Sequence, residues 1–446
     1  MADTPTLAHA APTVGGNIDY TRFLDCVHCG LCTSSCPTYL ETGDENNSPR
    51  GRIYLMRAVV DGRLPLSATV LEHLDLCLDC RNCETACPSG VQYGRLIEPF
   101  RVDTLEQPQA DGAAPRRDWF QRFIMFGLFP YARRLKWAVL PARLLQLLHL
   151  DAILEKLGVI RLLPQRLQRM QRLLPRLRGA SATLPKTLPA RDPQRARVAL
   201  FTGCVSEAMF SETNRATARV LQENGCEVVI PRNQVCCGAI HYHNGASAPA
   251  LEFAARNAAA FDALSVDAVI VNVAGCGAMM KDYTHIAEEC ELADAAQRDA
   301  LKHFTAKVKD VSEFLIELGP VPPTGPLPVR ATYHDACHLA HAQQIQSAPR
   351  ELLNLIPELE LIPLPESDLC CGAAGSYNLT QPKMADSLGQ RKIDNIARTS
   401  AQYVVAANAG CSLQIQAALR QNNQTAQVVH PIDLLDLSYR NAQPPT

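Results

Sequence analysis

Two runs of four cysteines near the N-terminus share one spacing. The first is Cys26-x-x-Cys29-x-x-Cys32-x-x-x-Cys36-Pro37, and the second is Cys77-x-x-Cys80-x-x-Cys83-x-x-x-Cys87-Pro88. This spacing is typical of ferredoxins with two [4Fe–4S] clusters, in which the fourth cysteine of each run ligates the other cluster. The predicted ligand sets are therefore Cys26, Cys29, Cys32 and Cys87 for one cluster, and Cys77, Cys80, Cys83 and Cys36 for the other.

Structural zinc and disulfides are the alternatives for these cysteines. A lone Cys-x-x-Cys pair would also suit an all-cysteine zinc site, but two complete runs with the same spacing and the same proline favour clusters. Residues 1–10 lack the basic and apolar segments of a signal peptide, so export is not expected. The chain nevertheless has 18 cysteines. Because thiols stay reduced in a chain that is not exported, we expect bound metal rather than disulfides.

Composition limits the class of protein. The chain has 446 residues, of which 47% are hydrophobic, so two or more domains with their own cores are expected. A formal net charge of −2 argues against a general nucleic-acid binder. No apolar run approaches the length of a membrane-spanning helix, so a soluble or peripheral protein is expected.

The segment between the two cysteine runs predicts helices. Pro49 can occupy a first helical turn, and Ser67 is a plausible N-cap for residues 67–76. So much helix favours the α-helical ferredoxin type over residues 19–103, rather than the compact β-hairpin type. Arg50 and Arg52 are either charges that offset the clusters and raise their potentials, or part of a solvated helix face.

Residues 104–118 and 179–195 have the polar, proline-rich composition of linkers and flank an unusual segment. Residues 116–178 contain 14 Arg or Lys and three Asp or Glu, together with Trp119 and Trp137. The spacing of leucines predicts basic amphipathic helices, a type that can lie in a membrane interface. We favour a helical connector packed on a partner subunit, and we keep peripheral membrane contact as the alternative.

The second half of the chain is a duplication. Cys204, Cys236-Cys237-Gly238 and Gly275-Cys276 recur as Cys337, Cys370-Cys371-Gly372 and Gly410-Cys411, with offsets of 133 to 135 residues. β-branched runs such as Ala268–Val271 and Tyr403–Val405 precede the last cysteine of each set and alternate with helical patterns. Two α/β modules with parallel strands are therefore expected, over residues 196–320 and 328–440. The predicted fold class is α+β multidomain: a helical ferredoxin domain, a helical connector and two duplicated modules.

Four cysteines in each module can converge on one metal centre, iron–sulfur or zinc, at the ends of the strands. The candidate ligands are Cys204, Cys236, Cys237 and Cys276 in the first module, and Cys337, Cys370, Cys371 and Cys411 in the second. Cys226 and Cys290 have no counterpart in the other repeat and are interpreted as structural thiols. Five nearby histidines are possible ligands, although an ordinary hydrogen-bonded role is simpler for each: His241, His243, His334, His338 and His341.

These motifs resemble those of the CCG-domain electron-transfer proteins, which include the heterodisulfide reductase catalytic subunits. The resemblance is closest to the iron–sulfur subunits of bacterial glycolate oxidases and covers almost the whole chain. It is carried by Pro49-Arg50-Gly51-Arg52-Ile53-Tyr54-Leu55, Cys80-Arg81-Asn82-Cys83-Glu84-Thr85, Cys236-Cys237-Gly238-Ala239 and Asn408-Ala409-Gly410-Cys411, in addition to the shared cluster motifs.

The resemblance implies an electron-transfer subunit without a substrate site. FAD-containing flavoprotein subunits would oxidise a 2-hydroxy acid such as glycolate, and this chain would relay the electrons towards a membrane quinone. The implied location is the cytoplasm, or the periphery of the cytoplasmic face of the inner membrane. No catalytic residue is assigned, and no glycine-rich dinucleotide fingerprint is present.

One departure from the pattern matters. In heterodisulfide reductase-like proteins each module ends in Cys-x-x-Cys, whereas here Cys276 and Cys411 each stand alone. The non-cubane cluster of that group and a stand-alone reductase activity are therefore less favoured. The alternatives are an iron–sulfur subunit of a sister complex acting on D-lactate or glycerol 3-phosphate, a heterodisulfide reductase-like protein, or a metal-bearing redox sensor.

Overall fold

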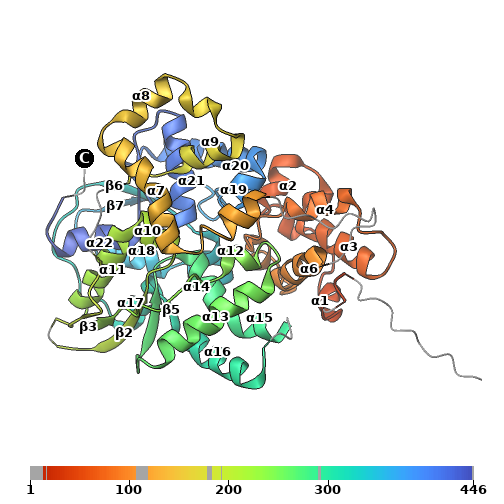
Figure 1. Cartoon of the computed structure of the whole chain (residues 1–446), viewed down its shortest axis with the longest axis horizontal. Coiled ribbons are helices and arrows are strands. Elements are labelled where there is room, and N and C mark those ends of the chain that lie inside the picture. The colour runs from red at the N-terminus through yellow and green to blue at the C-terminus, as the bar shows by residue number, and fades with distance from the viewer. Residues whose placement is uncertain are drawn as a thin grey trace, which may run out of the picture.

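The computed structural model describes residues 14–16, 18–106, 119–177, 183–191, 193–289 and 293–443. Figure 1 shows a helical N-terminal domain on one side of the molecule, two sheets with their helices on the other, and a helical arch above the sheets. The fold is α+β and multidomain, as the sequence predicts. None of the helices in the described part of the chain is long and apolar enough to cross a membrane.

The N-terminal domain is built from short helices that hold the two cysteine runs. They are α1 (Thr21–Leu24), α2 (Pro37–Thr42), α3 (Pro49–Val60), α4 (Ala68–Asp75), α5 (Asn82–Thr85) and α6 (Gly94–Glu106), with 3-10 turns at Leu31–Thr33 and Glu45–Asn47. Ser48 caps α3 through the backbone N–H of Gly51, and Ser67 caps α4 through that of Val70. The helix α6 continues to Glu106, into the segment predicted as a linker.

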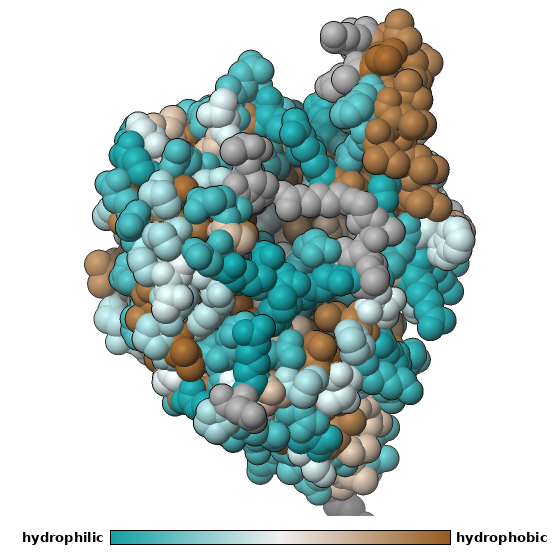
Figure 2. All heavy atoms as spheres, turned by 90° about the vertical axis from the view of Figure 1, so that its left-hand side faces the viewer, coloured by the Kyte–Doolittle hydropathy of each residue, from teal (hydrophilic) through white to brown (hydrophobic). Residues whose placement is uncertain are grey.

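The connector forms the arch. It consists of a π-helix (Phe120–Met125), α7 (Ala132–Leu147), α8 (Leu150–Lys156), a 3-10 turn (Val159–Leu162) and α9 (Gln165–Leu173). Leu135 and Val139 of α7 pack with Ala208 of the first module, and Phe120 packs with Leu379 of the second. The connector therefore rests on both modules of its own chain, while an apolar tip remains exposed (Figure 2).

The two modules are parallel sheets with matching registers. The first has the order β1-β3-β2-β4-β5, and the second has the order β7-β6-β8-β9. The strands are β1 (Thr187–Leu188), β2 (Ala196–Phe201), β3 (Cys226–Val229), β4 (Ala268–Val271), β5 (Val308–Asp310), β6 (Arg330–His334), β7 (Glu360–Ile362), β8 (Tyr403–Ala406) and β9 (Gln427–Val429). Only β1 is antiparallel among these described strands, and it lies in the segment that the sequence predicts as a second linker.

Helices cover both sheets. Those of the first module are α10 (Val205–Met209), α11 (Ser211–Glu223), α12 (Ala239–Tyr242), α13 (Ser247–Asp262), α14 (Ala274–Lys281), α15 (Tyr283–Glu289), α16 (Ala295–Lys307) and α17 (Val311–Leu318). Those of the second are a π-helix (His338–Ala342), α18 (Ala348–Asn354), α19 (Tyr377–Thr380), α20 (Pro382–Thr399), α21 (Ala409–Gln421) and α22 (Pro431–Tyr439). Apolar residues of both sheets, such as Leu200 and Val405, belong to one buried cluster, so the modules share a core.

Candidate metal centres

The cysteines of the two N-terminal runs line two neighbouring open cavities. Cys26, Cys29, Cys32 and Cys87 line the first, Cys36, Cys77 and Cys80 line the second, and Cys83 lines both. The fourth cysteine of each run thus lies among the thiols of the other run, which is the crossed arrangement expected from the spacing. That each thiol ligates a cluster stays a prediction.

Backbone geometry explains how three close cysteines face one cavity. In the first run His28 and Gly30 have φ values of 56° and 83°, and in the second run the equivalent residues Asp79 and Arg81 have 52° and 58°. Residues with positive φ on both sides of the second cysteine reverse the direction of the chain within a few residues. The loop of the first run therefore bends around its cavity, and the loop of the second run has the same bend.

A buried arginine lies against the second cavity. Arg52 is only 1% exposed, and its guanidinium lies 4.0 Å from the sulfur of Cys36 and donates to Thr38 and to the carbonyl of His73. Arg50 lines the first cavity and pairs with Glu45 at the surface. The solvated-face interpretation is therefore wrong for Arg52, whose fixed positive charge can offset a thiolate-bound cluster.

The four cysteines of the first module form one buried group of thiols. Cys204 and Cys236 lie 3.5 Å apart, Cys237 interacts with Cys236, and Cys276 interacts with Cys237. Hydrogen bonds with Cys204 and Cys237 raise the pKa of Cys236, and burial and the repulsion between neighbouring thiolates raise it further. A bound cation would stabilise the thiolate forms together, so the donor set fits a metal centre.

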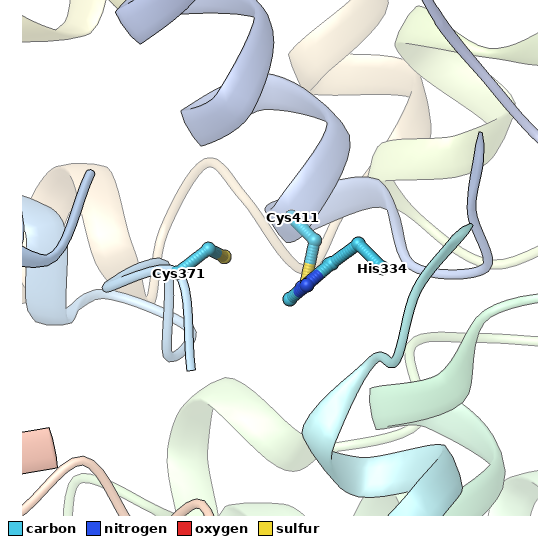
Figure 3. Close-up of side chains that lie close together, drawn as sticks. All are labelled: His334, Cys371 and Cys411. Atoms are coloured by element: carbon cyan, nitrogen blue, oxygen red, sulfur yellow. The ribbon is translucent and has the colours of Figure 1, made fainter. Parts of the chain in front are cut away.

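The second module repeats this group and adds an imidazole. Cys337 interacts with Cys370, Cys370 with Cys371, and Cys371 with Cys411. Each of three atoms, a ring nitrogen of His334 and the sulfurs of Cys371 and Cys411, lies within 4.8 Å of the other two. Figure 3 shows these side chains pointing toward one another from the end of β6, the Cys-Cys-Gly loop and the start of α21.

The second module is in contact with the ferredoxin domain through its cysteines. Cys80 belongs to a buried cluster with Cys370, and Cys337 packs against that cluster. Burial raises the pKa of Cys80, and the nearby charge of Cys337 raises it further. The cysteines of the first module interact instead with one another, with Tyr283 and with the charge of His243.

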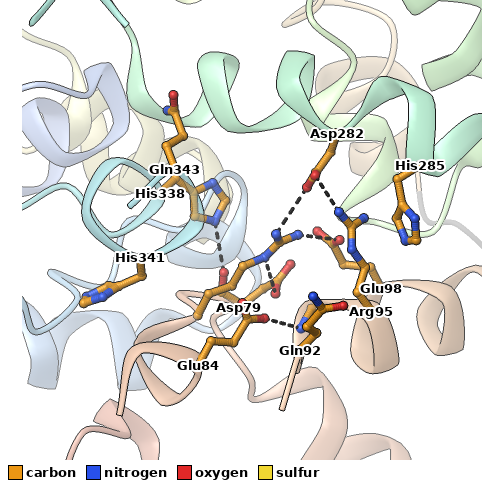
Figure 4. A network of polar contacts seen from close by, with 12 residues as sticks. Asp79, Glu84, Gln92, Arg95, Glu98, Asp282, His285, His338, His341 and Gln343 are labelled. Carbon is orange, nitrogen blue, oxygen red and sulfur yellow. Dashed lines mark hydrogen bonds and ion pairs between the residues drawn. The ribbon is translucent and has the colours of Figure 1, made fainter. Parts of the chain in front are cut away.

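A network of buried charges joins the ferredoxin domain to the first module (Figure 4). Arg81 pairs with Glu98 at 2.7 Å and with Asp282 at 3.2 Å, and Arg95 pairs with Asp282 at 2.7 Å. His243 lies 3.0 Å from Glu98. Burial opposes protonation of His243, but the carboxylates of Asp79 and Glu98 outweigh it and raise its pKa to about 10.

The structure gives the predicted histidines different roles. His241 stacks on Phe126, His338 lies within hydrogen-bond distance of the carbonyl of Asp79, and His341 contacts Thr85 and the carbonyl of Asp368. His338 and His341 thus have hydrogen-bond partners, as the sequence favours, whereas the contact of His241 is a stacked ring and that of His243 is an ion pair. His334 differs, because neither ring nitrogen has a hydrogen-bond partner among the described residues.

Two further expectations concern structural thiols. Cys226 is fully buried on β3 in the shared core, away from the thiol groups. Cys290 lies outside the described residues. Sequence reasoning missed Lys392, a buried lysine of α20 close to Cys370 and Cys371, and it also missed the network around Arg81. Neither has a local motif, since each depends on packing between distant segments.

Segments along the length of the chain match known protein families. Residues 22–91 match the family model of a 4Fe-4S dicluster domain, and residues 198–281 and 331–416 match the cysteine-rich CCG domain. Residues 116–174 match the linker region of glycolate oxidase iron–sulfur subunits. The chain therefore carries ferredoxin-type [4Fe–4S] sites and two cysteine-rich modules.

Relatives match over most of their own lengths. A probable glycolate oxidase iron–sulfur subunit of Bacillus subtilis is 39% identical over 94% of this chain and 94% of its own. The glycolate oxidase iron–sulfur subunit of Escherichia coli is 34% identical over 89% of this chain and 90% of its own. One subunit of the fumarate reductase (CoM/CoB) of Methanothermobacter marburgensis is 27% identical over 94% of this chain and 73% of its own.

Proposed function

Because the chain belongs to the family of glycolate oxidase iron–sulfur subunits, we propose that it is the electron-transfer subunit of a flavin-dependent glycolate dehydrogenase. It receives electrons from flavoprotein subunits and passes them towards a membrane quinone. Bound iron–sulfur clusters supply the one-electron chemistry. The observation that carries this proposal is an unbroken series of cysteine sites, from the exposed Cys29 to the buried thiols of the second module.

The predicted ligands and domain bounds are part of this proposal. The grouping of cysteines around the two cavities supports the crossed ligand sets, and the thiol groups of the modules support four cysteine ligands in each. The units proposed are residues 19–103, 116–178, 196–320 and 328–440.

The face around the first cavity suits the arrival of electrons from another subunit. Cys29 is exposed there, and Val27 and Leu31 are 67% and 58% exposed within the same cysteine run. Apolar side chains exposed around a redox site are a feature of a docking surface. We assign this surface to the flavoprotein, since a short distance between flavin and cluster requires contact at the exposed end of the series.

The order of the sites follows from shared and adjacent cysteines. Cys83 lines both ferredoxin cavities, so the two predicted clusters are neighbours. Cys80 lines the second cavity and packs in one cluster with Cys370. The proposed sequence is therefore first cavity, second cavity and second module, with the first module beside this route.

We propose that the exposed connector tip attaches to a membrane, rather than to the partner subunit that the sequence alone favours. Its apolar side chains are exposed on α7, α8 and the turns that flank α8, and include Trp137, Leu147, Leu157 and Leu162. Trp137 is 74% exposed, and basic residues outnumber acidic ones 14 to three over residues 116–178. A basic segment with exposed Trp and Leu fits an anionic lipid interface, which would bring the complex to its quinone. Failure of the full complex to float with anionic vesicles would instead favour a partner subunit at this tip.

The test is a donor assay on the complex purified anaerobically through this chain from its native host. We expect reduction of a quinone analogue with glycolate, together with a recovered flavoprotein. Activity with D-lactate or glycerol 3-phosphate alone would keep the relay and assign the chain to a sister complex. No activity with any donor and no recovered flavoprotein would contradict the proposal.

A further inference from the structure

Strand pairing makes Phe201 and His334 equivalent residues of the two modules. Phe201 is the last residue of β2 and pairs with Val271 of β4. His334 is the last residue of β6 and pairs with Ala406 of β8. Both residues stand three positions before the first cysteine of their module, Cys204 and Cys337. One module therefore places an apolar ring beside its cysteines, and the other places an imidazole there.

The surroundings of His334 are those of a group without its partner. The side chain is 0% exposed, and both ring nitrogens lack a hydrogen-bond partner among the described residues. A buried polar group left in this state destabilises the fold unless a bound partner satisfies it. A neutral imidazole is the form that ligates metals.

The distances fit one metal ion. Thiolate and imidazole ligands lie about 2.0–2.3 Å from zinc in a tetrahedral site, so that two ligand atoms are separated by about 3.5–4 Å. The ring nitrogen and the sulfurs of Cys371 and Cys411 already lie within 4.8 Å of one another. Figure 3 shows the three side chains turned toward one another.

We propose that His334 is a ligand of a metal ion in the second module, which it binds together with the sulfurs of Cys371 and Cys411. Zinc and iron both take imidazole together with thiolate, and the proposed electron route requires iron, because zinc has no redox change to offer. The first module, with Phe201 in the equivalent place, has a centre with thiolate ligands only. This inference rests on the proposal that the second module holds metal.

Four variants of the full-length chain, purified anaerobically, test the assignment by metal content. His334→Phe copies the first module, His334→Cys replaces one ligand by another, and Cys411→Ser removes a thiolate from the same site. Phe201→Leu is the matched control in the first module. We expect His334→Phe to lose as much metal per chain as Cys411→Ser, whereas His334→Cys and Phe201→Leu keep the wild-type content. Elemental analysis separates zinc from iron.

A second readout detects the bound nitrogen directly in the wild-type protein and uses a variant only to assign it. Wild-type protein labelled with ¹⁵N-histidine is studied by pulsed EPR if the site contains iron, or by X-ray absorption if it contains zinc. We expect a directly bound nitrogen that disappears in His334→Cys. Wild-type metal content in His334→Phe, with loss in Cys411→Ser, would overturn the inference and leave the proposed relay intact. Unchanged metal in both variants would overturn a metal centre in the second module and with it the last step of the proposed route, while the donor assay still tests whether the chain transfers electrons from glycolate.

Discussion

The two cysteine-rich modules have the same parallel register and the same four cysteines, but different neighbours. The second places Cys337 and Cys370 against Cys80 of the ferredoxin domain, and it adds His334 and Lys392 beside its thiols. The cysteines of the first interact with one another, and an ion network rather than a thiol contact ties this module to the ferredoxin domain. Duplication thus provided two similar sites, and among the described residues packing brought the thiols of the second, but not those of the first, against a cysteine of the proposed electron route.

The contact between Cys80 and the second module predicts the largest effect. Cys80→Ser should remove one ferredoxin-type cluster and lower quinone-analogue reduction by about 100-fold or more, because a missing cluster leaves a gap too long for rapid transfer. Flavin reduction by glycolate should persist, as stopped-flow absorbance would show. Undiminished quinone reduction in this variant would break the proposed order of sites.

The ion pairs that attach the two modules to the ferredoxin domain differ in burial, so breaking them should reduce the stability of the protein by unequal amounts. Asp282→Asn leaves Arg81 and Arg95 without their shared carboxylate and should cost about 2–3 kcal/mol. Glu41→Gln removes an ion pair with Arg391 near the surface of the second module and should cost less than about 1 kcal/mol. Thermal unfolding of holoprotein at a fixed scan rate compares them. An equal fall in unfolding temperature in the two variants would show that the more buried and the less buried ion pairs stabilise the protein equally.

A buried positive charge distinguishes the second thiol group. Ala250 of α13 lies close to Gly238, and Ala385 of α20 lies close to the equivalent Gly372. The two helices therefore correspond, and Lys392, seven residues after Ala385, is equivalent to Asn257, seven residues after Ala250. Removing a charge close to Cys370 and Cys371 should lower the reduction potential of the second centre, by tens of millivolts. Lys392→Asn, followed by redox titration with EPR detection, measures this shift. A potential that stays constant or rises would contradict the assigned role of the charge.

A surface carboxylate of the second module predicts a small dependence on pH. Its hydrogen bond with Arg391, reinforced by Asn395, outweighs burial and lowers the pKa of Glu366 to about 2. A lowered pKa means that the stabilisation is complete above the unfolded value of 4.5 and is lost as the pH falls towards 2. Because the side chain is 38% exposed, the effect should stay below about 1 kcal/mol. Urea unfolding at pH 7 and pH 4 should show Glu366→Gln approaching the wild type at the lower pH, and a widening difference would contradict this sign.

The cysteine without a counterpart should matter least. Cys226 is buried on β3 among apolar residues of the shared core, so Cys226→Ala should leave iron and zinc content unchanged and reduce stability only slightly. Metal analysis of the purified variant is the check. A loss of metal would assign Cys226 to one of the centres and remove a difference between the modules.

The sequence predicts those parts of the molecule that depend on the spacing of nearby residues. The cysteine runs, the caps at Ser48 and Ser67 and the duplicated strands are all readable, because each depends on neighbours in the chain. It does not show that Arg52 is buried against Cys36, that β1 joins a sheet from a proline-rich segment, or that Lys392 lies beside the second thiol group. Those facts depend on contacts between segments far apart in the sequence. The five histidines near the cysteines are alike in the sequence. In the described part of the structure, His334 differs because both of its ring nitrogens lack a hydrogen-bond partner.

The most direct test of the account compares two equivalent cysteines in the intact complex. Cys370→Ser and Cys236→Ser each remove the first thiol of a Cys-Cys-Gly motif, and only Cys370 shares a buried cluster with Cys80 among the described residues. Glycolate-driven reduction of a quinone analogue is measured for both variants and the wild type. The account predicts at least a tenfold loss for Cys370→Ser and less than a twofold loss for Cys236→Ser. Equal losses, or a larger loss for Cys236→Ser, would contradict a route that runs through the second module.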